Sequence, residues 1–459
     1  MIPVWRWTVR AHIERAVLLV LLTRASLLLA APVTLWLVAT RRPVVEQGYF
    51  FILWNVQALT QLMELGVGTL LVQFASHESR ALTWTVRGGL EGDSRSRAHM
   101  VQALHDAHRW YRAVAVALGV SGVLGGLWLI GVDAGGERAL LIPWCLTVAC
   151  TAAYLPLIPP LCVIEGCGGL LRVQAMRIVQ SIVSIAFLWT LLLTTDALWG
   201  VAGFAFGWLV TAWVWLRWRY PALMSMGTEP PMAVSSVREA RLAATQWRTG
   251  ATWLAWWVAP QCVTPILLKA QGGVSGGRVG MSLAIATAPL TIGLAWLQAR
   301  YPRYGVLVAT GDRSALRGLA ARATVQASVV CTLGVIGAAA AVWLIGRFSP
   351  VVAARALTPK WILVLGFTNL AWLLVQSLSS YLRAWRQEPM TETAVIGALL
   401  VVAGTALTAM VLPVEGVIVA YTLLIVGGVV PLSLVQFRRR HHVEPGADAG
   451  GKTAWSGRS

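Results

Sequence analysis

Apolar residues form about twelve long runs along the chain, separated by short polar connections. A run of about 18 or more apolar residues can cross the hydrocarbon core of a bilayer as a helix. The pattern therefore predicts an all-α polytopic membrane protein. The expected helices span residues 16–39, 50–74, 113–132, 140–163, 178–195, 198–216, 246–268, 279–297, 324–345, 361–381, 394–411 and 416–437.

One long polar stretch in mid-chain divides the predicted helices into two groups of six. Six helices per half give both halves the same orientation, and Ala31-Pro32 recurs as Ala259-Pro260 in the second half. This arrangement predicts two six-helix lobes with a central cavity. The predicted parts are an N-terminal lobe (1–225), a cytoplasmic linker (226–245), a C-terminal lobe (246–440) and a disordered cytoplasmic tail (441–459).

Composition supports a membrane protein, since 57% of residues are hydrophobic and only 12% are charged. The net charge of +18 would suit a nucleic-acid-binding protein. Most Lys and Arg residues, however, lie at the two termini and in alternate connections, which is the positive-inside bias of membrane proteins. We therefore expect no nucleic-acid partner, contact with membrane lipids, and both termini in the cytoplasm.

Two ionisable residues lie deep inside the first two apolar runs. Arg24 and Glu64 fall at matching depth if these runs are antiparallel helices, so the two side chains are expected to meet. A charge in hydrocarbon normally faces the protein interior or a wet cavity. The alternative is that Arg24 extends to the headgroups and that neighbouring polar groups hold Glu64.

Uncharged polar residues extend this candidate site. Gln57 and Gln61 share one helical face with Glu64, and that face is expected to point into the bundle. Asn369 and Gln376 give the second lobe a polar face in the same way.

The seventh predicted helix carries a second group of candidate binding residues. Trp253 and Trp257 offer aromatic faces on which sugar rings pack, and Gln261 follows Pro260 at a distorted, polar point. Arg248, near the start of this helix, would lie at the inner mouth of the cavity. Tryptophans facing lipid and an arginine extending to the headgroups are equally consistent with the pattern.

Three further segments have patterns of their own. Residues 77–112 are rich in Arg and His and predict an interfacial helix leading into the third span. Pro156, Pro159 and Pro160 must break or kink the fourth. The glycine-rich run 271–278 lacks a Gly-Lys-Ser/Thr sequence and a preceding strand, so it predicts an outer loop and not a nucleotide-binding loop.

Short motifs resemble one transporter family. Gln47-Gly48-Tyr49-Phe50, followed by Glu64-Leu65-Gly66-Val67-Gly68, resembles the helix-two signature of bacterial polysaccharide flippases. These Wzx-like proteins belong to the multidrug/oligosaccharidyl-lipid/polysaccharide exporter superfamily. Ile164-Glu165-Gly166-Cys167-Gly168 is similar to the family's Glu-Gly segment after helix four, and the plan of six plus six helices is shared.

The resemblance implies a flippase in the bacterial inner membrane. It would move a polyprenyl-diphosphate-linked oligosaccharide by alternating access, with Arg24 and Arg248 offsetting the charge of the diphosphate. Glu64 would then either hold Arg24 or bind a coupling proton or sodium ion. No other cofactor is expected, and polysaccharide biosynthesis enzymes are candidate partners.

Two other functions remain open at this point. A cation-coupled multidrug exporter shares the plan, and Glu64 among aromatic residues would suit a lipophilic cation. A membrane glycan polymerase or ligase is the enzymatic alternative. Such chemistry is expected to need a large external loop with paired ionisable residues, whereas the predicted outer connections are short.

Overall fold

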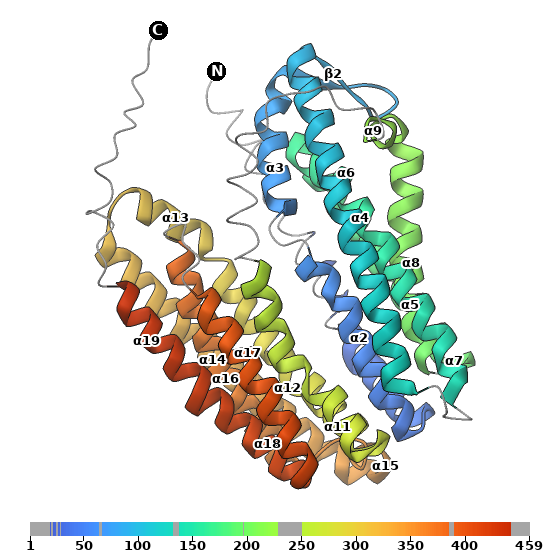
Figure 1. Ribbon diagram of the computed structural model, residues 1–459, viewed down its shortest axis with the longest axis vertical. Coiled ribbons are helices and arrows are strands. Elements are labelled where there is room, and N and C mark those ends of the chain that lie inside the picture. Colours follow the sequence, from blue (N-terminus) through green and yellow to red (C-terminus); the bar gives the residue numbers. More distant parts are fainter. Residues whose placement is uncertain are drawn as a thin grey trace. The chain divides into compact units, whose positions relative to one another are not determined.

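The computed structural model describes residues 19–63 (except 20, 21, 24, 25 and 28), 67–131, 137–195, 197–227, 250–384 and 390–441. The chain is almost entirely helical over these ranges (Figure 1). It packs as two compact units. Unit 1 takes the described residues up to Ala284 together with Val342–Thr358, and unit 2 takes Ile285–Ala341 and the chain from Pro359 onward.

Unit 1 is a helical bundle with one small β-hairpin. A core of buried apolar side chains fills it, including Leu104, Tyr111, Leu161 and Leu216. In chain order its elements are the helix Leu29–Arg41, α2 (Val44–Met63), α3 (Val67–Glu78), β1 (Leu82–Trp84), β2 (Leu90–Gly92), α4 (Ser94–Ile130), α5 (Leu141–Tyr154), α6 (Ile158–Ile164), α7 (Leu170–Thr194), α8 (Ala197–Arg219), α9 (Pro221–Met226), a helix over residues 250–261, α11 (Val263–Gln271), the first part of α12 (Gly273–Gln298) and α15 (Pro350–Ala353).

Unit 2 is also helical and has its own apolar cluster, centred on Tyr304, Leu316 and Tyr381. It contains the second part of α12, α13 (Tyr301–Ala309), most of α14 (Arg313–Phe348), α16 (Pro359–Arg383), α17 (Thr391–Val411), α18 (Val414–Leu423) and α19 (Val430–His441). A six-residue π-helical segment, Leu424–Val429, joins α18 to α19.

Several predicted helix limits need correction. In place of the helix predicted for 50–74, α2 begins earlier, at Val44, and is described to Met63, and α3 begins at Val67 after three residues outside the described ranges. The glycine-rich run expected as a loop is helical, since α12 begins at Gly273. Its glycines allow close packing on α2, which a sequence pattern alone does not reveal. The predicted interfacial helix before the third span is continuous with it in the 37-residue helix α4.

The prolines act as expected after α5. A short 3-10 turn, Leu155–Leu157, separates α5 from α6, because Pro lacks the N–H that a continuous helix requires. A π-helical segment, Glu165–Gly169, then leads into α7, and Gly168 there has a φ of 81°. Glycine adopts this left-handed conformation without the steric cost that a side chain would add.

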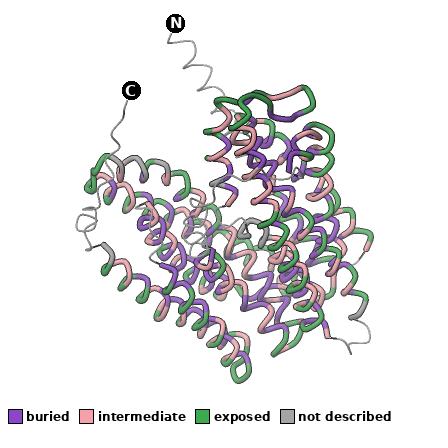
Figure 2. The backbone as a smooth tube through the Cα atoms, turned by 45° about the horizontal axis from the view of Figure 1, so that its top comes forward, coloured by how far each residue is buried: buried purple, intermediate pink, exposed green. Residues whose placement is uncertain are grey.

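A polytopic membrane protein is confirmed by length and hydropathy. Among the described residues, eight helical stretches are long and apolar enough to cross a bilayer, and one of them, Leu141–Thr194, covers the fourth and fifth predicted spans. Figure 2 shows exposed and buried positions alternating along the helices. On α14, Val325, Val329 and Leu333 are more than half exposed at helical spacing, as expected of a face toward lipid.

The division into lobes at residues 225 and 246 stays a prediction. Most of the predicted linker and nearly all of the predicted tail lie outside the described residues.

Candidate functional site

The charged residues of the predicted site lie outside the described part of the chain. These are Arg24, Glu64 and Arg248. The expected meeting of Arg24 and Glu64, and the position of Arg248 at the inner mouth of the cavity, therefore stay predictions. Gln61 lies in α2, but the position of its side chain is likewise outside the description.

Gln57 points into the helical bundle of unit 1. Its Oε1 accepts a hydrogen bond from the Thr151 hydroxyl of α5 at 3.1 Å. The same hydroxyl lies 2.6 Å from the carbonyl of Thr147, one turn earlier. Both threonines are buried, and Gln57 is half-buried. The expectation that this face of α2 looks into the bundle is confirmed at Gln57.

A chain of aromatic rings lies beside this contact and was not anticipated from the sequence. Phe50 and Trp54 of α2 stack with their ring centres 6.0 Å apart. Trp54 lies 4.9 Å from Phe204 of α8, and Phe204 stacks on Trp208 at 5.7 Å. Trp208 then meets Tyr154 of α5 edge to face at 6.3 Å.

This chain joins α2, α5 and α8 through an aromatic cluster, which we take as the candidate lining of a cargo site. Trp54 lies three positions before Gln57, so an aromatic face and an amide belong to one side of α2. Trp54 and Trp208 are only half-buried, which leaves part of each ring accessible. That i, i+3 spacing is the sequence signal that points to the lining.

The tryptophan helix does not bury the side chains that were selected from its sequence. Trp253 is 37% exposed, while Trp257 and Gln261 are half-buried. Trp256, three positions after Trp253 and on a neighbouring part of the same face, is 3% exposed. The structure therefore buries the tryptophan that the sequence analysis passed over.

Asn369 lies in unit 2, where it holds a neighbouring helix. Its Nδ2 donates to the Ala286 carbonyl of α12 at 2.8 Å, and the residue is 7% exposed. Three residues further along α12, Pro289 has no N–H to offer the preceding turn. The Asn369 amide therefore has a structural role, since it bonds the backbone of α12 near a proline.

Two of the family-like motifs have clear structural roles. Gln47 is fully buried, and its Nε2 donates to the carbonyls of Gly277, at 2.7 Å, and Arg355, at 3.0 Å. A Cβ on Gly48 would lie 3.0 Å from the Gly277 nitrogen, and one on Gly277 would lie 2.2 Å from the Val44 carbonyl oxygen. Glycines therefore bring the starts of α2 and α12 into backbone contact.

The Glu-Gly motif forms a similar close contact. A Cβ on Gly166 would lie 2.5 Å from the Val72 carbonyl oxygen of α3. Beside it, Glu165 accepts a hydrogen bond from Nη2 of Arg177 at 3.3 Å, which forms an ion pair. The motif thus joins the π-helical segment to α3 and positions a paired carboxylate.

Comparisons with known proteins bear on this fold. No protein-family profile and no curated protein matches the chain. Among solved structures, the chain is similar to a multidrug resistance MATE family transporter of the MOP superfamily in its inward-facing conformation, with 12% identity, a TM-score of 0.56, and coverage of 89% of this chain and 97% of that one.

Two more solved structures give the same result. The outward-facing conformation of a multidrug resistance MATE family transporter matches with 15% identity and a TM-score of 0.54. A MATE in complex with MaD3S matches with 15% identity and a TM-score of 0.53. Each match covers 94% of this chain and 95% of the other. The chain therefore has the fold of MATE transporters, as expected for an all-α membrane protein with two six-helix lobes.

Proposed function

We propose that this protein is a membrane transporter that carries a polyprenyl-diphosphate-linked oligosaccharide across the bacterial inner membrane by alternating access. The observation that carries the proposal is the joint lining of aromatic rings and neutral hydrogen-bonding groups in unit 1. The accessible parts of the half-buried Trp54 and Trp208 rings offer surface for the C–H groups of sugars, and the half-buried Gln57 offers an amide for sugar hydroxyl groups.

The charges on the diphosphate need a separate partner. Arg24 and Arg248 are the residues we assign to it, since a guanidinium binds phosphate oxygens in a bidentate manner. Glu64 then holds Arg24 while the cavity is empty, or takes up a coupling proton or sodium ion.

The close contact between α2 and α12 supports a transport cycle. The Nε2 of Gln47 on α2 bonds the Gly277 carbonyl of α12, and this bond forms only while the two helices touch. In alternating access, one end of the carrier must open while the other is closed. The positive-inside bias places this contact at the outer end, so we assign it to the outer seal.

The second candidate function is export of lipophilic cations. The observation that favours it is that two of the solved structures similar to this chain are multidrug resistance MATE family transporters. Such a cargo needs an available carboxylate in the lining. Glu165 is already paired with Arg177, so Glu64 is the residue that would have to supply it.

The deciding experiment is transport in proteoliposomes. A fluorescent polyprenyl-diphosphate oligosaccharide is supplied on one side, and its appearance on the other is measured for the wild type and for Trp54→Leu, Arg24→Ala and Glu64→Gln. Phe206→Leu is the matched control, because Phe206 is 42% exposed and pairs with Phe187 away from the lining.

We expect a several-fold loss of translocation for Trp54→Leu and Arg24→Ala, and unchanged rates for Phe206→Leu. Equal rates for Trp54→Leu and the wild type would reject the lining. If the wild type moves no glycan but expels a lipophilic cation, and this efflux is lost in Glu64→Gln, the drug exporter replaces the flippase.

A further inference from the structure

The turn of the β-hairpin and the end of α8 together form an exposed patch on unit 1. These two segments are about 130 residues apart in the sequence, and the helices predicted from the sequence gave no sign that they meet. We call this surface the tip patch. It comprises Val86, Arg87, Arg172, Arg217, Trp218 and Arg219.

The turn is fixed against α8 by backbone contacts. Gly88 has a φ of 70°, and a Cβ there would lie 2.4 Å from the Arg219 carbonyl oxygen. The Ala222 N–H donates to the Arg87 carbonyl at 3.3 Å. The tip of the hairpin is therefore held at the end of α8.

Aromatic side chains that pack between the hairpin and α8 support the same arrangement. Tyr220 is 2% exposed and lies between Trp84 of the hairpin, at 5.4 Å, and Trp215 of α8, at 5.0 Å. The Trp84 Nε1 also donates to the Cys167 carbonyl at 3.2 Å. A rigid apolar base thus holds the patch in place.

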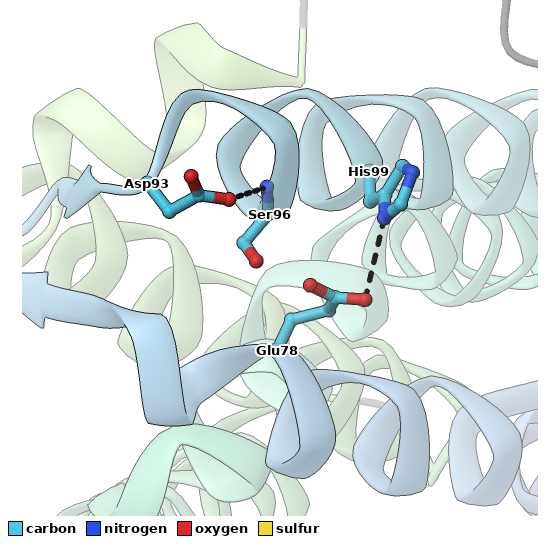
Figure 3. Close-up of polar contacts among 4 residues, drawn as sticks. All are labelled: Glu78, Asp93, Ser96 and His99. Atoms are coloured by element: carbon cyan, nitrogen blue, oxygen red, sulfur yellow. Dashed lines mark hydrogen bonds and ion pairs between the residues drawn. The ribbon is translucent and has the colours of Figure 1, made fainter. Parts of the chain in front are cut away.

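The base of the hairpin is fixed as well. Figure 3 shows Asp93, directly after β2, accepting from the Ser96 backbone N–H, which caps α4 at 2.9 Å. Before β1, Glu78 lies 3.4 Å from Nδ1 of His99 on α4. Both ends of the hairpin are therefore tied to α4.

The tip patch presents apolar and basic groups to the outside. Val86 is fully exposed, and Trp218 is 88% exposed. The four arginines are exposed too, and among the described residues no carboxylate forms an ion pair with any of them. Arg172 reaches the Tyr220 hydroxyl at 3.5 Å, which draws it toward the others. The hairpin carboxylate, Glu91, lies opposite Thr83, away from the turn.

We propose that the tip patch is a binding surface for anionic phospholipid headgroups. The apolar span of α8 ends at Arg219, so the patch lies where a bilayer passes from hydrocarbon to headgroups. Trp and Val side chains insert favourably at that level, and Arg binds lipid phosphates. Basic groups near an anionic leaflet are attracted to it electrostatically. The charge and shape of the patch fit this surface.

The test compares lipid preference in purified protein. The full chain is reconstituted in nanodiscs of phosphatidylcholine alone or of phosphatidylcholine with phosphatidylglycerol, and native mass spectrometry counts the retained lipids of each kind. The test variant is Arg87→Gln/Arg217→Gln/Arg219→Gln. The control, Arg313→Gln/Arg317→Gln/Arg322→Gln, removes the same charge from exposed positions of α14.

We expect the wild type and the α14 control to retain phosphatidylglycerol preferentially, and the tip variant to lose most of this preference. The conservative variant Arg87→Lys/Arg217→Lys/Arg219→Lys should keep much of it, which separates charge from folding. Equal losses in the tip variant and the α14 control would overturn the proposal, because the effect would then follow net charge. Unchanged preference in the tip variant would overturn it as well.

A depth measurement gives a second readout. A fluorophore attached at Val86→Cys should be quenched by headgroup-labelled phosphatidylglycerol, with wild-type protein treated in the same way to account for the native cysteines. Absence of quenching in anionic nanodiscs would show that the tip does not meet the lipid surface.

Discussion

Single glycines decide how closely the helices of this protein approach one another. Gly277 brings α12 against the Val44 carbonyl, and Gln47 then bonds the Gly277 carbonyl across the contact. Gly337, in α14, has open space where a Cβ would be. Two glycines in long helices thus differ only in what surrounds them.

Gly277→Ala should therefore lower the free energy of unfolding by about 1–3 kcal/mol, since the new methyl group must push two backbones apart. Gly337→Ala should leave stability unchanged or raise it by about 1 kcal/mol or less, through better helix propensity. Thermal unfolding in one detergent measures both. Similar changes in the two variants would contradict the close contact at Gly277.

Gln57 offers a test at the candidate lining. In Gln57→Leu, the Thr151 hydroxyl keeps the Thr147 carbonyl as a partner and is not left unpaired, so the stability cost of losing this bond should be about 1 kcal/mol. Glycan translocation should fall several-fold, because an amide facing the cargo is lost. A thermal melt and the proteoliposome assay give the two values. Unaltered transport in a stable variant would exclude Gln57 from the binding site.

At the scale of elements, the hairpin shows how a short motif depends on its support. Two three-residue strands have little stability by themselves. Contacts with α8, α4 and Cys167 provide the stability that the two strands lack by themselves. Loss of one contact at the turn should therefore loosen the whole hairpin.

Gly88→Ala tests this dependence. The substitution adds backbone strain at a positive φ and a clash with the Arg219 carbonyl. Gly311→Ala is the control, since Gly311 has a φ of 74° but open space around it. We expect faster hydrogen exchange across residues 82–92 only in Gly88→Ala. Equal protection of the hairpin in both variants would mean that the contact with α8 does not hold it.

At the scale of the whole molecule, the direction of the chain in the membrane follows from its basic residues. The positive-inside bias predicts that the hairpin lies in the cytoplasm and the start of α12 outside. Val86 and Val274 are both well exposed, so each can carry a single cysteine label.

A membrane-impermeant maleimide applied to intact cells should therefore label Val274→Cys and should reach Val86→Cys only after permeabilisation. Wild-type cells set the background from the native cysteines. The reverse labelling pattern would invert the proposed orientation, and with it the assignment of the α2–α12 contact to the outer seal.

The sequence alone was enough to predict a membrane protein. In the hydrocarbon core of a bilayer, a long apolar run must form a helix, because only then are its backbone N–H and C=O groups all hydrogen-bonded. The sequence also predicted the break near Pro156 and Pro160, and the position of Gln57 on the face of α2 that points into the bundle. Both predictions depend only on local composition and helical spacing, and neither prediction requires knowledge of which helices are neighbours.

Only the tertiary structure decided which side chains meet. The backbone contact at Gly277, the aromatic chain from Phe50 to Tyr154 and the joining of the hairpin to α8 all connect distant segments. Trp253 and Trp256 show the limit most clearly, since similar residues three positions apart turned out exposed and buried, respectively. Periodicity defines the faces of a helix, but packing against other helices determines which face is covered.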